Sequence, residues 1–392
     1  IPIIAITGTN GKTTTTRLTA HIMKSAGRKV GFTTSDGVYI NNQMMMKGDC
    51  TGPISAQFVL KDPTIDFAVL ECARGGILKS GLAFQNCDVS IVTNVAADHM
   101  GLGGINTIEQ MAKLKAVVPE TTRKDGYAIL NADDDLTFSM ARGLECNVAL
   151  FSMDENNPRI KAHCEDGGIA TVYENGYISL LKGTWKIRII PAREVPLTYE
   201  AKAVHNIANC LPAVLAAYIF KDVSIAEIKQ ALKTFVPGDA LTPGRLNFFP
   251  FKDFTFLADF AHNPHGLKLL GDFVSKLDYP HKVGVISGTG DRRDEDIREL
   301  GALSAGFFDE IIIRCDKNLR GRTAEEIIGL LLEGIHSVNA ELPTMTIPNE
   351  DQALEYIYNN HKPGSLYTIM CDVVAGAIDK IKQLKQREES GS

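Results

Sequence analysis

The sequence predicts an α/β protein with two domains, and three observations support this expectation. Short apolar runs alternate along the chain with segments of helical periodicity, which is typical of mostly parallel sheets covered by helices. The chain has 392 residues, more than one hydrophobic core usually supports. A stretch rich in Pro and Gly, VPGDALTPGR at residues 236–245, separates two such alternating regions. We therefore expect domains at 1–240 and 245–388.

The first region opens with the apolar strand IPIIAIT, which is followed by a helix expected over Lys12–Ser25. Later in this region the dipeptide Asn175-Gly176 favours a two-residue hairpin turn. It predicts a small antiparallel ribbon within about 160–191, inserted at the edge of the domain. Further buried strands are expected at 65–71, 88–93, 127–130 and 147–151.

Two capping boxes mark the starts of later helices. Ser224 with Glu227, and Thr323 with Glu326, have the spacing at which a side chain and a backbone amide cap each other. After the linker, strands and helices alternate again over about 246–385, which predicts a smaller doubly wound domain. Its strands are expected at 254–260, 282–287, 309–314 and 366–370.

Composition excludes several classes of function. The formal net charge is -6, from 41 basic and 47 acidic side chains, so a protein that coats nucleic acid or an anionic membrane is not expected. The sequence has no apolar run of about 18 residues, so no membrane span is predicted. The eight cysteines are scattered without a C-x-x-C pair, which favours reduced, buried thiols and a cytoplasmic location.

The sequence GTNGKT at residues 8–13 lies directly between the first strand and the first helix, the context that a phosphate-binding loop requires. The common form has a glycine six residues before the lysine, but Ile6 stands there, so this is a shorter variant. Lys12 would reach the β- and γ-phosphates of a nucleotide, and the Thr13 hydroxyl would bind Mg²⁺. The alternative is an ordinary turn with a surface lysine. The predicted nucleotide-binding residues here are Gly8, Thr9, Asn10, Gly11, Lys12, Thr13 and Thr14.

Glu71 ends a buried strand and should emerge at the carboxyl edge of the sheet, beside this loop. Mg²⁺ bound to phosphates usually takes one or two carboxylates as well, so Glu71 is the predicted metal carboxylate. The alternative is an acid in solvent at the end of a strand.

A second polar cluster follows the next strand, at residues 93–94 and 98–99 of TNVAADHMG. Ligand sites in α/β proteins form at such strand ends. Farther along, Lys113 and Lys115 lie on a predicted helix, and residues two apart face different sides of a helix. We expect one of the two lysines to point into the site and the other to be solvated.

Taken together, these motifs resemble the Mur ligase family. GTNGKTT, the strand-end Glu71, TNVAADHMG, AKLKAVV and LNADDD occur in the order of that family's central domain. HNIANCLPAVLAA, PGR and DFAHNP continue the order into its C-terminal domain. Within the family, TTSDGVYI, GDCTGP, ECARGGIL, DHMGLGG and GTGDRRDEDIRELG are similar to the Mur-like part of the cyanophycin synthetase branch. The match covers nearly the whole chain and begins at the strand of the phosphate loop.

The resemblance implies a P-loop Mur-ligase central domain with a small antiparallel β insertion, followed by a smaller, doubly wound, Rossmann-like C-terminal domain. It implies ATP and two Mg²⁺ ions. Thr13 and Glu71 would hold the first ion, and His99 and Lys113 would serve the second. Because a lysine cation cannot bind Mg²⁺, we expect a carbamate on Lys113. Lys12, His99 and Lys113 would be the catalytic residues.

Further nucleotide contacts are implied for both domains. Asn206 matches a segment that contacts adenine, although a helix cap is an equally good explanation for it. Arg245 matches an arginine that reaches the nucleotide phosphates, and Asp259 and His262 match residues that contact ribose and phosphate. We therefore expect the second domain to close over ATP by a hinge near 237–243.

The implied reaction is ATP-dependent amide synthesis through an acyl phosphate. In the cyanophycin branch this part adds arginine to the β-carboxyl of aspartate in a peptide or polymer, and an ATP-grasp domain of the same larger protein adds the aspartate. A homo-oligomer is expected, with no nucleic acid or membrane as partner. Arg74 is a candidate for binding the acceptor's carboxylates, or a surface arginine. Four acids in loops after strands of the second domain are candidates for binding guanidinium, or solvated loop acids: Asp291, Asp294, Asp316 and Asp372.

Three other interpretations remain open from the sequence. The first is another Mur-type ligase, acting on a peptidoglycan precursor or a folylpolyglutamate. The second is a P-loop kinase or simple ATPase, which explains GTNGKT but leaves TNVAADHMG and DFAHNP unaccounted for. The third is a non-catalytic Mur-like module of a larger synthetase, against which the intact Lys12, Glu71 and His99 argue.

Overall fold

A computed structural model describes residues 1–391, and its internal packing divides the chain into two compact units. The first unit comprises Ile1–Ala97 and Gly103–Val236. The second comprises Asp98–Leu102 and the chain from Pro237 onward. The boundary at residue 236 falls at the start of the predicted linker. The short segment Asp98–Leu102, expected in the first domain, packs with the second unit instead.

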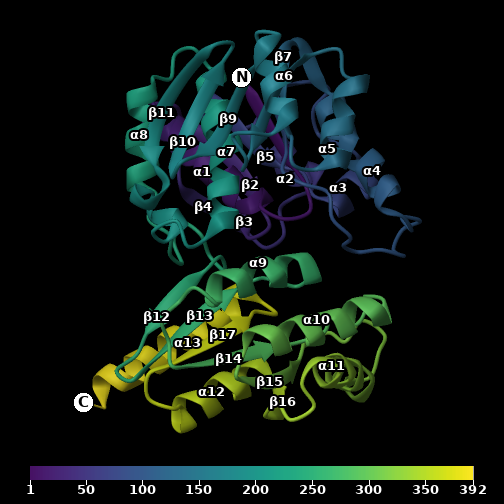
Figure 1. Cartoon of the computed structure of the whole chain (residues 1–392), viewed down its shortest axis with the longest axis vertical. Coiled ribbons are helices and arrows are strands. Elements are labelled where there is room, and N and C mark those ends of the chain that lie inside the picture. The colour runs from purple at the N-terminus through teal and green to yellow at the C-terminus, as the bar shows by residue number, and fades with distance from the viewer. Residues whose placement is uncertain (392) are drawn as a thin grey trace. The chain divides into compact units, whose positions relative to one another are not determined.

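The first unit is built on a sheet of the order β11-β10-β9-β8-β7-β6-β1-β5-β2-β3-β4, which is parallel from β9 to β2 (Figure 1). The strands are β1 Ile3–Thr7, β2 Val30–Thr34, β3 Gly37–Ile40, β4 Gln43–Lys47, β5 Phe67–Glu71, β6 Cys87–Val92, β7 Thr122–Asn131, β8 Asn147–Ser152, β9 Ile169–Glu174, β10 Tyr177–Lys182 and β11 Trp185–Pro191. The helices are α1 Lys12–Ser25, α2 Pro53–Leu60, α3 Arg74–Ser80, α4 Ile108–Glu120, α5 Asp135–Ser139, α6 Pro158–Glu165, α7 Val204–Ile219 and α8 Ile225–Thr234, with short 3₁₀ turns at Met140–Gly143, Ala192–Glu194 and Pro196–Thr198.

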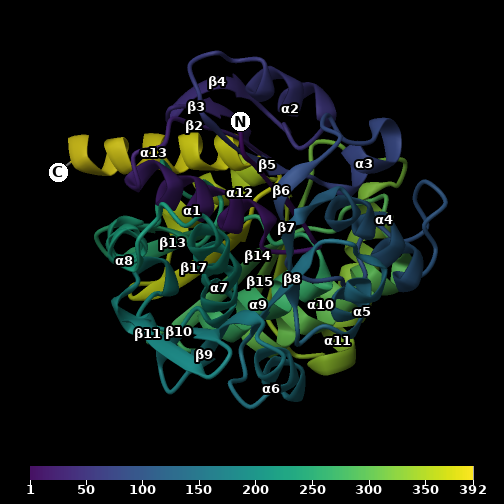
Figure 2. The same ribbon diagram turned by 90° about the horizontal axis from the view of Figure 1, so that it is seen from above.

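Both faces of β1 are buried, as expected for a central parallel strand. Ile3 and Ala5 belong to a core shared with α2, α3 and α4, while Ile4 and Ile6, which alternate with them, are also fully buried. Helix α1 packs against β1, β2 and β5, with α7 and α8 beside it (Figure 2). Because β1 is covered on both sides, the loop that follows it is held on a rigid base.

The predicted antiparallel ribbon is present, and it continues the main sheet at one edge of the first unit. Asn175 and Gly176 have φ angles of 47° and 84°, and they turn the chain between β9 and β10 as the dipeptide predicted. Strand β9 pairs parallel with β8, so the ribbon β9–β11 forms one end of the sheet. A second antiparallel ribbon, β2–β4, forms the other end and was not anticipated.

The second unit has a sheet of the order β12-β13-β17-β14-β15-β16, in which β12 alone among the described strands runs antiparallel to its neighbour. The predicted capping box of Thr323 and Glu326 opens α11, which lies beside α10 (Figure 1). The core of this unit lies around Phe256 and Ile369. Its strands are β12 Asn247–Pro250, β13 Phe254–Asp259, β14 His281–Ile286, β15 Glu310–Cys315, β16 Thr344–Asn349 and β17 Ser365–Met370, and its helices are α9 Pro264–Val274, α10 Asp294–Phe307, α11 Ala324–Val338, α12 Glu350–Asn360 and α13 Val374–Ser390.

Candidate active site

The loop between β1 and α1 has the backbone shape of a phosphate cradle. Gly8 has a φ of 145° and Gly11 a φ of 88°, values that side chains rarely allow. A Cβ atom on Gly8 would lie 1.9 Å from the Thr93 hydroxyl oxygen, and one on Gly11 would lie 2.2 Å from Asn209 Oδ1. Within the described chain, no side chain caps the first turn of α1. Backbone N–H groups at the amino end of a helix are suited to binding an anion.

Lys12 and Thr13 open α1, as the motif predicted. The Lys12 ammonium donates a 2.8 Å hydrogen bond to the carbonyl oxygen of Thr9, so it folds back over the loop. The Thr13 hydroxyl donates a 2.9 Å hydrogen bond to Glu71 Oε2 and lies 3.1 Å from the Ser35 hydroxyl. The backbone N–H of Ser35 also donates to Glu71 Oε2, at 3.3 Å. Glu71 is only 3% exposed, so a buried carboxylate stands against the hydroxyl that the motif assigns to a metal.

The segment after β6 forms hydrogen bonds with the phosphate loop. The Thr9 N–H donates to the Asn94 carbonyl at 2.9 Å, and the Asn10 N–H donates to the Asn94 side-chain oxygen at 3.0 Å. The Thr93 hydroxyl donates to the Asn10 carbonyl at 2.7 Å. The sequence predicted a ligand site at the end of this strand but not these contacts with the phosphate loop. In the structure, these side chains fix the loop's shape.

The lysine of α4 that points toward the phosphate loop is Lys115. Lys115 is 2% exposed, and its ammonium donates a 2.7 Å hydrogen bond to the carbonyl oxygen of Gly8. Lys113 is exposed. The two residues differ by two positions on a helix and therefore face different sides, as expected. The catalytic and metal-holding role of Lys113 stays a prediction.

His99 packs within the second unit and has a φ of 55°, which is uncommon for a residue with a side chain. Its Nδ1 lies 3.1 Å from Asp98 Oδ1, and its Nε2 lies 3.3 Å from an Arg292 guanidinium nitrogen. Since arginine only donates, Nε2 accepts and Nδ1 carries the proton toward Asp98. A metal ion on Nε2 would compete with Arg292 for the same lone pair. The described contacts therefore tie His99 to Arg292 and leave its metal role a prediction.

Asn206 is the third residue of α7 and does not cap it, because Ala203 holds the cap position. Its side-chain N–H donates to the Leu197 carbonyl at 2.9 Å, and its oxygen accepts from Asn209 at 3.1 Å. Asn209 is the residue whose side-chain oxygen faces Gly11. Asn206 therefore supports the phosphate loop through Asn209, a connection that the sequence did not reveal. Contact of Asn206 with adenine stays a prediction.

The second unit gathers Arg245, Asp259 and His262 near the end of β13. Asp259 accepts the backbone N–H groups of Leu246 and Ala261 at 2.9 and 2.8 Å, and burial raises the pKa of this carboxyl although Arg245 opposes the change. Burial likewise lowers the pKa of the His262 imidazole, with Asp98 acting in the other direction. The Arg245 guanidinium stacks on Phe260 at 5.2 Å. The DFAHNP sequence thus forms one packed cluster, and its contact with a nucleotide stays a prediction.

Three of the four acids proposed to bind guanidinium already pair with arginines of the same unit. Asp291 pairs with Arg292 and Arg320, which occupies the carboxylate as a substrate would. The backbone N–H of Lys317 donates to Asp372 Oδ2 at 2.9 Å, and no arginine among residues 1–391 pairs with this acid. Asp294 pairs with Arg322 and Asp316 with Arg314. Arg74, the candidate for acceptor carboxylates, is partly exposed at the start of α3.

The donor set at Thr13 and Glu71 suits a magnesium–nucleotide complex better than an isolated metal. Among the described residues, no group of three or more His, Cys, Asp or Glu side chains could hold a metal ion. Mg²⁺ bound with a nucleotide takes phosphate oxygens and water as its remaining ligands, so one carboxylate and one hydroxyl suffice. The glycine cradle and the amino end of α1 would bind the phosphates of the nucleotide. None of the helices described is long and apolar enough to cross a membrane.

Two family models match this chain. The Mur ligase middle domain matches residues 6–217, and the Mur ligase glutamate ligase domain matches residues 244–373. The first alone covers more than half of the chain and includes the phosphate loop, Glu71, and Thr93 and Asn94 after β6. The chain therefore belongs to the Mur ligase family.

Within that family, the chain is similar to cyanophycin synthetases. It is 49% identical over 383 residues to the one from Geminocystis herdmanii and 50% identical to the one from Crocosphaera subtropica, covering 98% of this chain and 44% of each relative. The chain thus spans less than half the length of these curated relatives. Among solved structures, FolC of Escherichia coli in complex with DHPP and ADP matches with a TM-score of 0.71 at 19% identity, covering 98% of this chain and 89% of that one. This likeness shows that the fold is shared.

Proposed function

We propose that the chain is an ATP-dependent ligase that joins an acid to an amino acid, and that it adds arginine to the β-carboxyl of aspartate in a growing polymer. The observation that carries the proposal is the buried Thr13–Glu71 pair at the mouth of the glycine cradle. Identity of about half over nearly the whole chain to proteins named cyanophycin synthetase supports the choice of substrates. The acceptor would be an aspartate-containing peptide or polymer.

The proposed reaction has two steps. A carboxylate oxygen of the acceptor attacks the γ-phosphorus of ATP, ADP leaves, and the acid becomes an acyl phosphate. The amine nitrogen of arginine then attacks the acyl carbon, loses its proton and expels inorganic phosphate. Because the first step brings two anions together, the protein must supply positive charge and hold both groups in line.

The residues of the first unit divide this work. The backbone between Gly8 and Gly11 holds the phosphates, and the Lys12 ammonium offsets the negative charge that collects on them. Thr13 and Glu71 would hold Mg²⁺, which supplies further charge neutralisation when bound. Two magnesium ions, a carbamate on Lys113, an ATP-grasp partner in the same protein, a homo-oligomer and a cytoplasmic location stay predictions.

The decisive measurement is phosphate release from ATP with acids and amines supplied separately and together. We expect release to require both an aspartate peptide and arginine, with an amide product of matching mass. Lys12→Ala should abolish turnover while the circular dichroism spectrum is unchanged. Lys24→Ala, on the same helix but exposed, is the matched control and should remain active.

The substrate screen also tests the other interpretations. Turnover with diaminopimelate or glutamate in place of arginine would indicate a different Mur-type ligase. Phosphate release that needs neither an acid nor an amine would indicate a simple ATPase. Tight ATP binding without turnover under any pairing would indicate a non-catalytic module and would overturn the proposal.

A further inference from the structure

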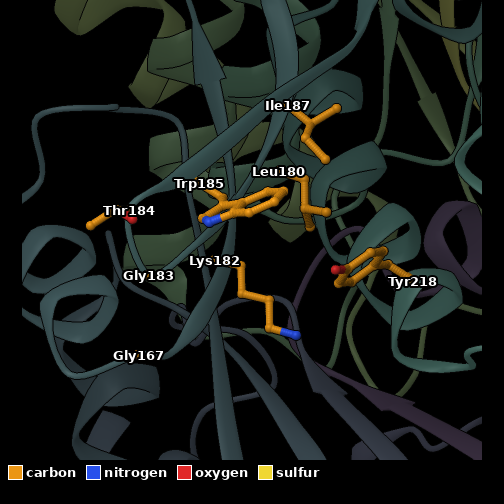
Figure 3. Close-up of a pocket in the computed structure, with 8 residues that line it drawn as sticks. All are labelled: Gly167, Leu180, Lys182, Gly183, Thr184, Trp185, Ile187 and Tyr218. Atoms are coloured by element: carbon orange, nitrogen blue, oxygen red, sulfur yellow. The ribbon is translucent and has the colours of Figure 1, made fainter.

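A pocket far from the phosphate loop in sequence lies on the ribbon at one end of the first sheet (Figure 3). Its cavity volume is about 520 Å³, within the range of small-ligand pockets. It is built by three segments that the proposed reaction does not use. These are the loop before β9, the hairpin of β10 and β11, and the end of α7. The lining residues are Gly167, Leu180, Lys182, Gly183, Thr184, Trp185, Ile187 and Tyr218.

The pairing of β10 and β11 explains the chemistry of this pocket. Lys182 is opposite Trp185, and Leu180 is opposite Ile187, so two cross-strand pairs lie on one face of the ribbon. Figure 3 shows Trp185, Lys182 and Tyr218 around the same space, with the Tyr218 hydroxyl directed toward the strands. The opposite face carries the ionic cluster of Glu174 and is chemically separate.

The pocket offers aromatic faces beside one ammonium group. Trp185 is 75% exposed although it is the only tryptophan of the chain, which is unusual for so large an apolar side chain. Lys182 forms no ion pair with any residue of the described chain, whereas Lys186, four positions on, pairs with Glu174. Indole and phenol faces attract planar cations, and a lone ammonium attracts one carboxylate. The complementary ligand therefore carries one cation and one carboxylate.

We propose that this pocket binds an arginine-bearing unit of the polymer, an inference that rests on the proposed function. Arginine joined to aspartate through its α-amine keeps a free guanidinium and a free carboxylate, one charge of each sign on each unit. The guanidinium would lie against Trp185 and Tyr218, and the carboxylate would pair with Lys182. A second attachment point raises the effective concentration of the acceptor at the reacting end. A nucleotide suits the pocket less, since its polyphosphate would need more than one cation.

Trp185 makes the test direct, because tryptophan emission from this chain reports on this pocket alone. The probe is a peptide of three aspartates, each carrying arginine on its β-carboxyl. We expect a saturable change in emission, weaker binding of free arginine, and no change with the unmodified aspartate peptide. Lys182→Met should weaken binding about tenfold, the loss of one charge-assisted contact. Lys47→Met removes an exposed lysine of β4 as the matched control and should bind normally.

Trp185→Ala lacks the fluorescent side chain, so calorimetry measures its peptide binding instead. We expect binding weakened about tenfold, because the variant loses the aromatic contact with the guanidinium. No saturable change with the arginylated peptide would overturn the proposal. Equal responses to unmodified peptide or ATP would also overturn it. Emission that depends on protein concentration without ligand would show that a second copy of the chain covers this face, and it would also overturn the proposal. Lys12→Ala should bind the peptide normally, so loss of ligation with binding intact would contradict the proposed reaction and not this pocket.

Discussion

The ammonium nitrogen of Lys115 lies 2.7 Å from the carbonyl oxygen of Gly8, the first glycine of the phosphate loop. The contact joins residues 107 positions apart and brings a buried positive charge to the cradle. Lys113 differs in direction by about 200° around the same helix and is exposed. The two lysines of AKLKAVV therefore lie in different surroundings, one buried against the phosphate loop and one exposed.

Lys115→Met should reduce ATP turnover at least about 100-fold, because it removes a charge-assisted hydrogen bond that holds Gly8. Lys113→Met tests the predicted carbamate on this residue, and its loss should also reduce turnover. The measurement is phosphate release at saturating substrates, with thermal unfolding as the check on folding. Unchanged turnover in Lys113→Met would contradict the predicted carbamate, and unchanged turnover in Lys115→Met would contradict a role for the contact with Gly8.

Glu71→Gln keeps the size of the side chain but removes its charge. We expect turnover to fall about 100-fold, and the magnesium concentration that gives half-maximal rate to rise about tenfold, because a neutral amide is a poor magnesium ligand. Rates measured across a magnesium series test this expectation. Glu120→Gln, at the exposed end of α4, is the control. An unchanged magnesium dependence in Glu71→Gln would remove this carboxylate from the metal site.

Gly11→Ala should destabilise the protein by about 2–4 kcal/mol, for two reasons. Its φ of 88° disfavours any side chain, and its Cβ would lie 2.2 Å from Asn209 Oδ1. Gly27→Ala separates the two causes, since Gly27 has a φ of 85° but nothing within 4 Å of the added atom. We expect about 1 kcal/mol for that variant. Denaturant unfolding measures both, and equal losses would mean that Asn209 moves aside freely.

The parts of the fold that follow from local chemistry could be predicted from the sequence. The strand–glycine–helix order placed α1 over Lys12–Ser25, and the capping boxes at Ser224 and Thr323 are formed as expected. Each of these signals acts within a few residues, so neighbouring residues suffice to specify it. The position of Glu71 beside the phosphate loop also followed, because strand ends of a parallel sheet share one edge.

What the sequence left undecided depends on contacts between distant residues. Which of Lys113 and Lys115 faces the phosphate loop depends on the rotation of α4 against β1, which helical periodicity alone does not set. The acids proposed for guanidinium binding are paired with arginines that are close only in the folded unit, as Asp316 is with the buried Arg314. The support of Gly11 by Asn209 joins positions 198 apart, a contact that no local pattern encodes.

Glu174 should make stability depend on pH through the ribbon of β9–β11. Hydrogen bonds from Arg188, with Lys186 and Ser179 adding to them, lower the pKa of its carboxyl from 4.5 to about 2, against the effect of burial. A carboxyl whose folded pKa is depressed contributes stability above its unfolded pKa and loses it as the pH falls toward the folded value.

We therefore expect Glu174→Gln to be less stable than the parent by about 1 kcal/mol at pH 7, a modest value because Arg188 and Lys186 are half-exposed. The difference should persist down to about pH 5 and disappear between about pH 5 and pH 2, where the parent loses the ionised carboxylate. Denaturant unfolding of both proteins across this range measures it. Glu165→Gln, an exposed acid on α6, should follow the parent throughout. A Glu174→Gln difference that is constant with pH would indicate lost packing and not lost charge.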